Sequence, residues 1–175
     1  TPLYSVDAPL CFETTHELEA LLARRVQREL KTGPIILVGS GSEFRRLEAI
    51  SGMDASLIVS LRFPTKPDVS SIGAADATSL DRLAAWEQAP TNARRLSDAG
   101  LRVALTASKL PKGQKFHANL RKAIEHGLSE DTALAMLTTA PAEILGVGGS
   151  LGAVAPGYHA NLVVTDGPIF DEDST

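Results

Sequence analysis

The chain has 175 residues, of which 43% are hydrophobic, with a formal net charge of −4 and an isoelectric point near 5.5. Such a chain can bury one substantial core and has the composition of an ordinary soluble globular protein. Acidic and basic residues are interleaved, no run approaches the ~18 apolar residues of a membrane span, and no signal-peptide pattern opens the chain. We therefore expect neither nucleic acid nor membrane as a partner. Cys11 stands alone, which excludes an internal disulfide and leaves the compartment undetermined.

Short apolar runs alternate with amphipathic segments along the first 125 residues. The runs at 9–12, 35–38, 57–61 and 102–106 are typical of buried parallel strands, because they do not alternate with polar residues. The segments between them predict helices. Such alternation favours an α/β fold with right-handed crossovers, as half of a barrel or as a small open sheet.

The first helix is expected to begin in a capping box formed by Thr14 and Glu17 and to bury a leucine-rich face. That face carries Leu18, Leu21, Leu22, Val26 and Leu30. Residues 62–78 predict a long polar loop, and a loop of that length is uncommon in a compact domain unless it has a function or is disordered.

The C-terminal third has the most legible order of elements. A helix ends near Gly127, Ser129 can cap the next helix, and an apolar strand is expected at 160–164 after the turn 155–157. Three ordered groups of residues carry a familiar pattern: Gly127-Leu128 with Ala133-Leu134; Thr138, Pro141-Ala142 and Leu145-Gly146; and Gly152, Gly157 and 160–164.

This pattern resembles the C-terminal signature of the amidohydrolase superfamily, the metal-dependent hydrolases related to imidazolonepropionase and dihydroorotase. It departs at Asn161, where the family usually has Asp. The resemblance implies that residues 1–146 are the second half of a (β/α)8 barrel and that 147–175 return to a small accessory β-domain. A whole barrel needs on the order of 250 residues. We therefore expect a C-terminal portion whose partner is the remainder of a parent barrel or a second copy.

The resemblance also implies zinc or another divalent metal. In the family, His residues after the fifth and sixth barrel strands bind the metal, and an Asp after the eighth orients or deprotonates the attacking water. The corresponding positions here are Glu13, Gly39 and Ala107 or Ser108. None of them is the expected ligand, so we predict no cofactor in this segment and no catalytic residue. The four histidines show no metal-site spacing with one another or with a carboxylate.

Candidate ligand-binding residues lie where the predicted strands end. The turn Gly39-Ser40-Gly41-Ser42 could cradle an anion with backbone N–H groups, or could be a tight turn with Ser42 as a helix cap. Together with Glu13, Arg62 and Ser108 it forms the candidate set for a small-molecule ligand. The leading interpretation is a degenerate, non-catalytic barrel segment. The alternatives are part of an active hydrolase of C–N bonds, whose other ligands come from the rest of the parent chain, and an anion-binding module using 39–42.

Overall fold

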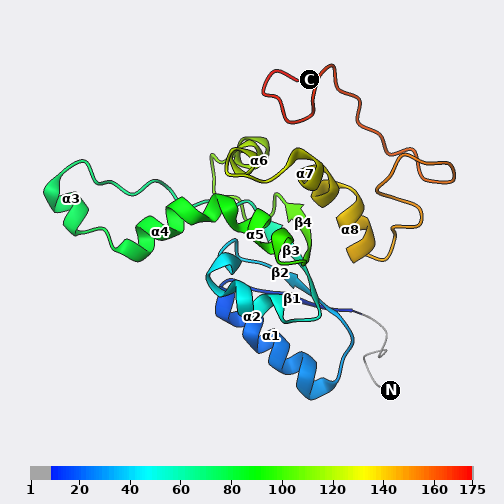
Figure 1. Cartoon of the computed structure of the whole chain (residues 1–175), viewed down its shortest axis with the longest axis horizontal. Coiled ribbons are helices and arrows are strands. Elements are labelled where there is room, and N and C mark those ends of the chain that lie inside the picture. The colour runs from blue at the N-terminus through cyan, green and yellow to red at the C-terminus, as the bar shows by residue number, and fades with distance from the viewer. Residues whose placement is uncertain (1–8, 175) are drawn as a thin grey trace.

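A computed structural model describes residues 9–174. Its centre is a four-stranded parallel sheet with the strands in sequential order, β1-β2-β3-β4 (Figure 1). The strands are β1 (Leu10–Glu13), β2 (Ile35–Val38), β3 (Ala55–Ser60) and β4 (Arg102–Thr106). Sequential order means that every crossover advances in one direction, as in a (β/α)8 barrel, whereas a doubly wound sheet reverses at a switch point. The predicted α/β class is confirmed.

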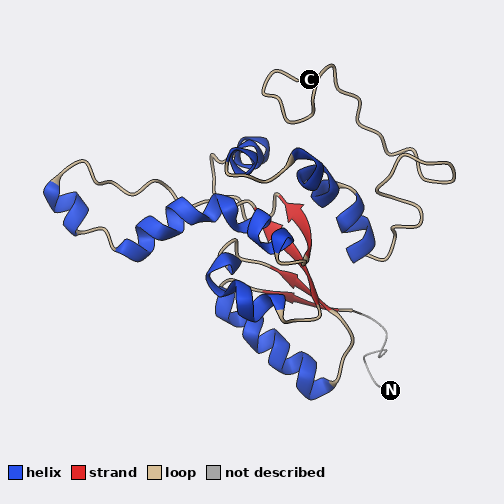
Figure 2. Cartoon of the chain, in the orientation of Figure 1, coloured by secondary structure: helices blue, strands red, loops and turns tan. Residues whose placement is uncertain are grey.

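Helices form the connections and the segment after the sheet (Figure 2). They are α1 (Glu17–Leu30), η1 (Glu43–Arg46), α2 (Leu47–Ser51), α3 (Ile72–Asp76), α4 (Leu80–Gln88), η2 (Ala89–Thr91), α5 (Asn92–Asp98), α6 (Phe116–Glu125), α7 (Glu130–Leu137) and α8 (Thr139–Ile144). Ser129 caps α7 as predicted, accepting from the backbone N–H of Thr132. None of the helices in the described part of the chain is long and apolar enough to cross a membrane.

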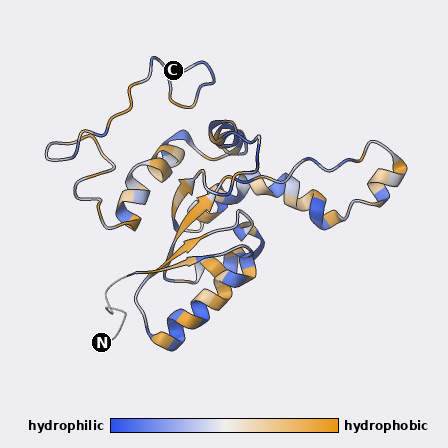
Figure 3. Ribbon diagram, turned by 180° about the vertical axis from the view of Figure 1, so that it is seen from behind, coloured by the Kyte–Doolittle hydropathy of each residue, from blue (hydrophilic) through white to orange (hydrophobic). Residues whose placement is uncertain are grey.

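The main core lies on one face of the sheet. Leu37, Leu57 and Val59 point to this face and are at most 1% exposed, and they pack in one cluster with Leu96 of α5 and Leu120 of α6. Figure 3 shows the hydrophobic strands at the centre of the molecule and mixed hydropathy along the surrounding helices. The unalternated apolar runs thus mark strands buried inside a layered α/β structure.

The opposite face of the sheet carries a much smaller cluster. Ile36, Ala104 and the half-buried Ile58 meet Ile144 of α8 there. Cys11, which alternation places on the same face of β1, is exposed. Since parallel sheets are normally covered on both faces, this face is the one that a closed barrel would turn inward.

Helix α1 turns a different face to the core than predicted. Ala20 and Ala23 are buried, whereas Leu18, Leu22 and Leu30 are 44%, 61% and 64% exposed. Small side chains allow the helix to approach the sheet closely, which leaves the leucines on its flanks. The expectation of a buried leucine-rich face was therefore wrong for Leu18, Leu22 and Leu30, while Leu21 packs half-buried against the main core.

The start of α1 also differs from the predicted capping box at Thr14 and Glu17. The N-cap is His16, whose ring nitrogen accepts from the backbone N–H two residues on. Glu19 accepts hydrogen bonds from the backbone N–H and the hydroxyl of Thr15 at 2.6 and 3.1 Å, and these bonds lower the pKa of Glu19. A glutamate thus does accept from the backbone before the helix, as in a capping box, but two residues later than predicted and without a reciprocal bond from the N-cap side chain to its N–H.

The long loop predicted after β3 leaves the body as an arm that contains the short helix α3 (Figure 1). Its tip is open to solvent, with Ile72 84% exposed. The base of the arm is ordered by Trp86, whose ring lies 5.9 Å from the ammonium groups of both Lys66 and Lys122. Only the root of the arm, next to the sheet, is therefore placed to contribute to a site at the strand ends.

After α8 the chain runs as a loop away from the sheet (Figure 1). The strand predicted at 160–164 does not form among the described residues, and Val163 and Val164 are 81% and 87% exposed. A strand needs a neighbour to satisfy its backbone groups, and the described part of the chain supplies none for this apolar segment. The accessory β-domain assigned to 147–175 stays a prediction.

Candidate functional site

The predicted site residues gather at the carboxyl edge of the sheet. Glu13 ends β1, Gly39 follows β2, and Arg62 and Ser108 each lie two residues beyond the ends of β3 and β4. In parallel α/β folds, ligands and reacting groups are found at this edge. The predicted residues therefore lie together at the edge where the sequence placed them, and their contacts show how each is used in the fold.

The turn after β2 encloses a carboxylate of the chain itself. Glu43 is 2% exposed, and its Oε1 accepts from the backbone N–H groups of Ser40 at 2.5 Å and Gly41 at 3.1 Å, and from the Ser40 hydroxyl at 3.1 Å. A Cβ atom on Gly39 would lie 2.6 Å from the same oxygen, so only glycine fits there. The N–H groups expected to cradle an external anion are thus occupied by an internal one.

Asn92, at the start of α5, holds this carboxylate from the other side. Its amide Nδ2 donates to Glu43 Oε2 at 2.7 Å, and its Oδ1 accepts from the N–H of Phe44 at 2.7 Å. The predicted cap role of Ser42 is not seen, because its side chain makes no capping bond to η1. Neither Glu43 nor Asn92 was singled out from the sequence. The available signal was a Glu three residues after Ser40, as in a capping box.

A lysine that follows β4 contacts the carboxyl end of β1, the strand at the other side of the sheet. Lys109 Nζ lies 2.8 Å from Glu13 Oε1 and donates to the carbonyl of Thr14 at 3.3 Å. Its backbone φ of 63° is left-handed, an uncommon conformation for a residue with a side chain. The carbonyl of Ser108 accepts from the Ser60 hydroxyl at 2.6 Å. Glu13 and Ser108 thus take part in contacts that tie the strand ends together.

A cavity of about 160 Å³ remains between the ends of β1, β2 and β3. The structure brings four of the predicted residues together there: Ser40, Gly41, Ser42 and Arg62. The other lining residues are Thr15, Phe44, Pro64, Ala85 and Ala89. The lining therefore combines polar and apolar residues, while Glu13, Gly39 and Ser108 lie outside it.

The backbone on both sides of Arg62 is held by amide side chains. Asn119 Nδ2 donates to the carbonyl of Leu61 at 2.7 Å, and Gln114 Nε2 donates to the carbonyl of Phe63 at 2.8 Å. The two amides are themselves joined, because Asn119 Nδ2 also lies 2.8 Å from Gln114 Oε1. These hydrogen bonds from Asn119 of α6 and from Gln114, in the loop before it, fix the backbone on both sides of Arg62.

The four histidines do not converge on this edge. His16 caps α1, and a ring nitrogen of His126 lies 2.7 Å from the carbonyl of Lys122 at the end of α6. His117 packs edge-on against Phe116. All the histidines are exposed, and the described residues contain no group of three or more His, Cys, Asp or Glu side chains that could hold a metal ion.

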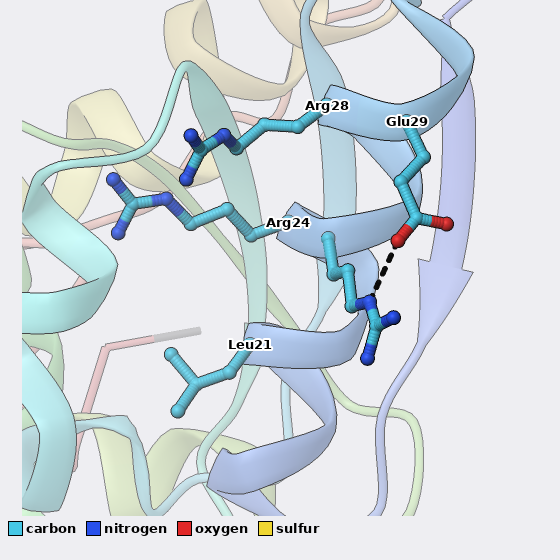
Figure 4. A pocket seen from close by; sticks show the side chains of 5 residues that line it. Leu21, Arg24, Arg28 and Glu29 are labelled. Carbon is cyan, nitrogen blue, oxygen red and sulfur yellow. Dashed lines mark hydrogen bonds and ion pairs between the residues drawn. The ribbon is translucent and has the colours of Figure 1, made fainter.

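A wider depression of about 550 Å³ lies along α1 (Figure 4). Arg24, Arg28 and Leu21 line it, and the ion pair between Arg25 Nε and Glu29 Oε1 at 2.7 Å borders it. It is on the outer surface of a helix, near the half of α1 that leads to the amino ends of the strands. In barrels that end contributes stability, so this depression is not the candidate site.

The sequential parallel sheet with helical connections defines a protein of the α/β barrel type. A model of the amidohydrolase family matches residues 70–175, which is more than half of the chain. The chain belongs to the amidohydrolase family.

Similar proteins agree with this assignment. Amidohydrolase tasK of Hapsidospora irregularis is 35% identical over 78 residues, which are 44% of this chain and 8% of that protein. The crystal structure of an amidohydrolase from Thermotoga maritima MSB8 superposes with a TM-score of 0.73 at 23% identity, over 95% of this chain and 40% of that one. A prolidase complexed with N-methylphosphonate-L-proline has a TM-score of 0.54 at 20% identity, over 90% of this chain and 38% of that one.

The chain thus spans less than half of each of these relatives. The solved structures share its fold. The family is generally metal-dependent, and the strand ends of this chain do not supply the donors that such a metal needs. Glu13 is the carboxylate at the end of β1 and is paired with Lys109, Gly39 has no side chain, and Ser108 offers a hydroxyl where a carboxylate is implied.

Proposed function

We propose that this chain forms the second half of an amidohydrolase-type (β/α)8 barrel and that this half is a non-catalytic scaffold. The observation that carries the proposal is that polar groups at the carboxyl edge of the sheet are bound to other groups of the chain itself. The N–H groups after β2 bind Glu43, and the carboxylate after β1 is paired with Lys109. A hydrolytic metal centre requires several imidazole or carboxylate groups directed to one open point.

Two surfaces support a role as half of a larger barrel. The face of the sheet with Ile36 and Ile58 carries only a small cluster, although parallel sheets are normally covered on both sides. Leu18 and Leu22 on the flank of α1 are 44% and 61% exposed, where a preceding βα unit would pack in a barrel. These surfaces favour the remainder of a parent barrel, or a second copy, as the partner.

The test is the metal content of the full-length polypeptide that contains this chain. We expect elemental analysis to give the same metal content for the wild type, for Glu13→Gln and for the matched control Glu29→Gln on the exposed side of α1. A barrel metal held in part by this half would behave differently. Loss of tightly bound zinc in Glu13→Gln but not in Glu29→Gln would overturn the proposal.

The same variants address the alternative, in which this half takes part in hydrolysis of C–N bonds with ligands from the rest of the polypeptide. That alternative requires amide or cyclic-amide hydrolysis to fall when Glu13 or Ser108 is replaced. We expect any such activity of the full-length protein to be unchanged within about twofold in Ser108→Ala, since surface changes outside reacting groups have small effects. A loss of a hundredfold or more in Ser108→Ala, with the fold intact, would favour the alternative.

A further inference from the structure

The cavity between the ends of β1, β2 and β3 has one charged lining residue among those described. That residue is Arg62, and no described residue forms a hydrogen bond or an ion pair with its guanidinium group. Arg45, in η1, by contrast pairs with Asp81 of α4 at 3.1 Å. Arg62 is an exposed residue. An arginine that lines a cavity is suited to bind a planar anion through two parallel N–H groups of its guanidinium.

Ser42, another polar residue of the lining, adds a second hydrogen-bond donor. The hydroxyl of Ser42 has no hydrogen-bond partner among the described residues, whereas the hydroxyl of Ser40 is engaged by Glu43 and by the N–H of Ser42. The carboxylate of Glu43 is directed to the turn and to Asn92, and Glu43 does not line the cavity. Arg62 and Ser42 are therefore the groups left to bind a ligand.

The rest of the lining is largely apolar and includes Phe44, Pro64, Ala85 and Ala89. A volume of about 160 Å³ corresponds to roughly five water molecules at ~30 Å³ each. A ligand that matches both the polar and the apolar lining residues has one anionic end and a short hydrocarbon body.

The walls of the cavity are held in place before any ligand arrives. Asn119 and Gln114 fix the carbonyl groups on either side of Arg62. A Cβ atom on Gly41 would lie 3.3 Å from the carbonyl oxygens of Ser60 and Arg62, so the turn after β2 packs directly on the backbone after β3. Pre-organisation of this kind reduces the entropy lost on binding.

We propose that this cavity binds a short-chain carboxylate, with the carboxylate on Arg62 and Ser42 and the hydrocarbon body against Phe44 and Pro64. The site is distinct from the turn that encloses Glu43. It requires no metal and no bond cleavage, and it does not depend on whether the barrel is catalytic. The cavity opens at the carboxyl edge, where ligands of α/β proteins bind.

The experiment uses the full-length polypeptide and titrates butanoate, with butanamide as the neutral control, followed by NMR chemical shifts. We expect butanoate to bind at least about tenfold more tightly than butanamide, because a charged hydrogen bond is stronger than a neutral one. Arg62→Gln should weaken butanoate binding by about tenfold to a hundredfold, and Ser42→Ala by less. Arg46→Gln, an equal charge change on an exposed arginine outside the lining, should leave it unchanged.

Circular dichroism of each variant separates loss of binding from loss of structure. Arg62→Lys keeps the charge without the two parallel donors, so it should bind with intermediate affinity. Equal binding of butanoate and butanamide by the wild type would overturn the proposal, as would undiminished butanoate binding by Arg62→Gln. If Arg62→Gln does not fold, the proposal is tested by the comparison of butanoate with butanamide in the wild type and by butanoate binding to Arg62→Lys. Failure here leaves the metal-content test of the scaffold role unaffected.

Discussion

Two neighbouring strand ends of this protein use their polar groups in opposite ways. After β2, the backbone N–H groups of Ser40 and Gly41 bind the buried carboxylate of Glu43. After β3, Arg62 has no partner among the described residues and lines a cavity. The polar groups of the first end are therefore used by the fold itself, whereas the guanidinium of the second has no partner among the described residues. The comparison shows that a turn with the residues of an anion site can be consumed by the fold itself.

The largest expected effect is at the buried carboxylate. Glu43→Ala removes the acceptor of the Ser40 and Gly41 N–H groups and of the Asn92 amide. Buried donors left without partners are destabilising by about 1–3 kcal/mol each before water enters. We expect the free energy of unfolding, measured by urea denaturation of the full-length protein, to fall by about 3 kcal/mol. Glu48→Ala, an exposed neighbour in α2, should change it by less than about 0.5 kcal/mol.

A loss below about 1 kcal/mol in Glu43→Ala would mean that water replaces the carboxylate easily. The turn after β2 would then remain usable by an external anion, and the contrast between the two strand ends would disappear. Protection of Glu43→Ala by inorganic phosphate in a thermal-shift titration would point in the same direction.

An intermediate effect is expected from the contact between the two strand ends. Gly41 has φ +91° and its Cβ position lies 3.3 Å from two carbonyl oxygens. Gly41→Ala should lower the free energy of unfolding by about 2–3 kcal/mol, because left-handed backbone and crowding both oppose a side chain. Gly113 has a similar φ of +89°, but a Cβ atom there would have no neighbour within 4 Å. Gly113→Ala should therefore lower the free energy of unfolding by about 1 kcal/mol, through the cost of the left-handed backbone alone.

The difference between these two glycine variants measures how tightly the turn after β2 rests on the backbone after β3. Equal destabilisation of Gly41→Ala and Gly113→Ala would show that the turn can move away. The cavity would then lack the fixed wall assigned to it.

The smallest effect on stability is expected at Arg62. Its guanidinium has no described partner, so Arg62→Gln should change the free energy of unfolding by no more than about 0.5 kcal/mol. This result, beside a large loss in Glu43→Ala, would sharpen the contrast between a group used for folding and a group available for a ligand. A destabilisation of 2 kcal/mol or more would instead assign Arg62 to the folded structure.

Much of the fold was predictable because its signals are local. The runs at 35–38 and 102–106 coincide with β2 and β4, since an unalternated apolar run must be buried on both faces. Ser129 caps α7 because a serine before an apolar segment satisfies the free N–H groups of the first turn. The signature in the C-terminal third identified the family that the comparisons show.

Other features followed from contacts between distant residues. The face of α1 that packs on the core is centred on Ala20 and Ala23, because the distance between helix and sheet, and not the hydropathy of the helix alone, selects the side chains that fit. The segment 160–164 has the composition of a strand and no neighbour among the described residues. A strand is a property of two segments, so composition alone did not determine it.

By itself the sequence determined the α/β class and the edge of the sheet at which the candidate residues lie, whereas the order of the strands came from the structure. Only the tertiary structure decided which polar groups at that edge are used. Asn92 reaches Glu43 across 49 positions in the chain, and Lys109 reaches Thr14 across 95. Hydrogen bonds and ion pairs depend on distances in space that no local pattern encodes. That is why the turn 39–42 looked open and is filled by Glu43, while Arg62, a member of the same candidate set, has no side-chain partner among the described residues.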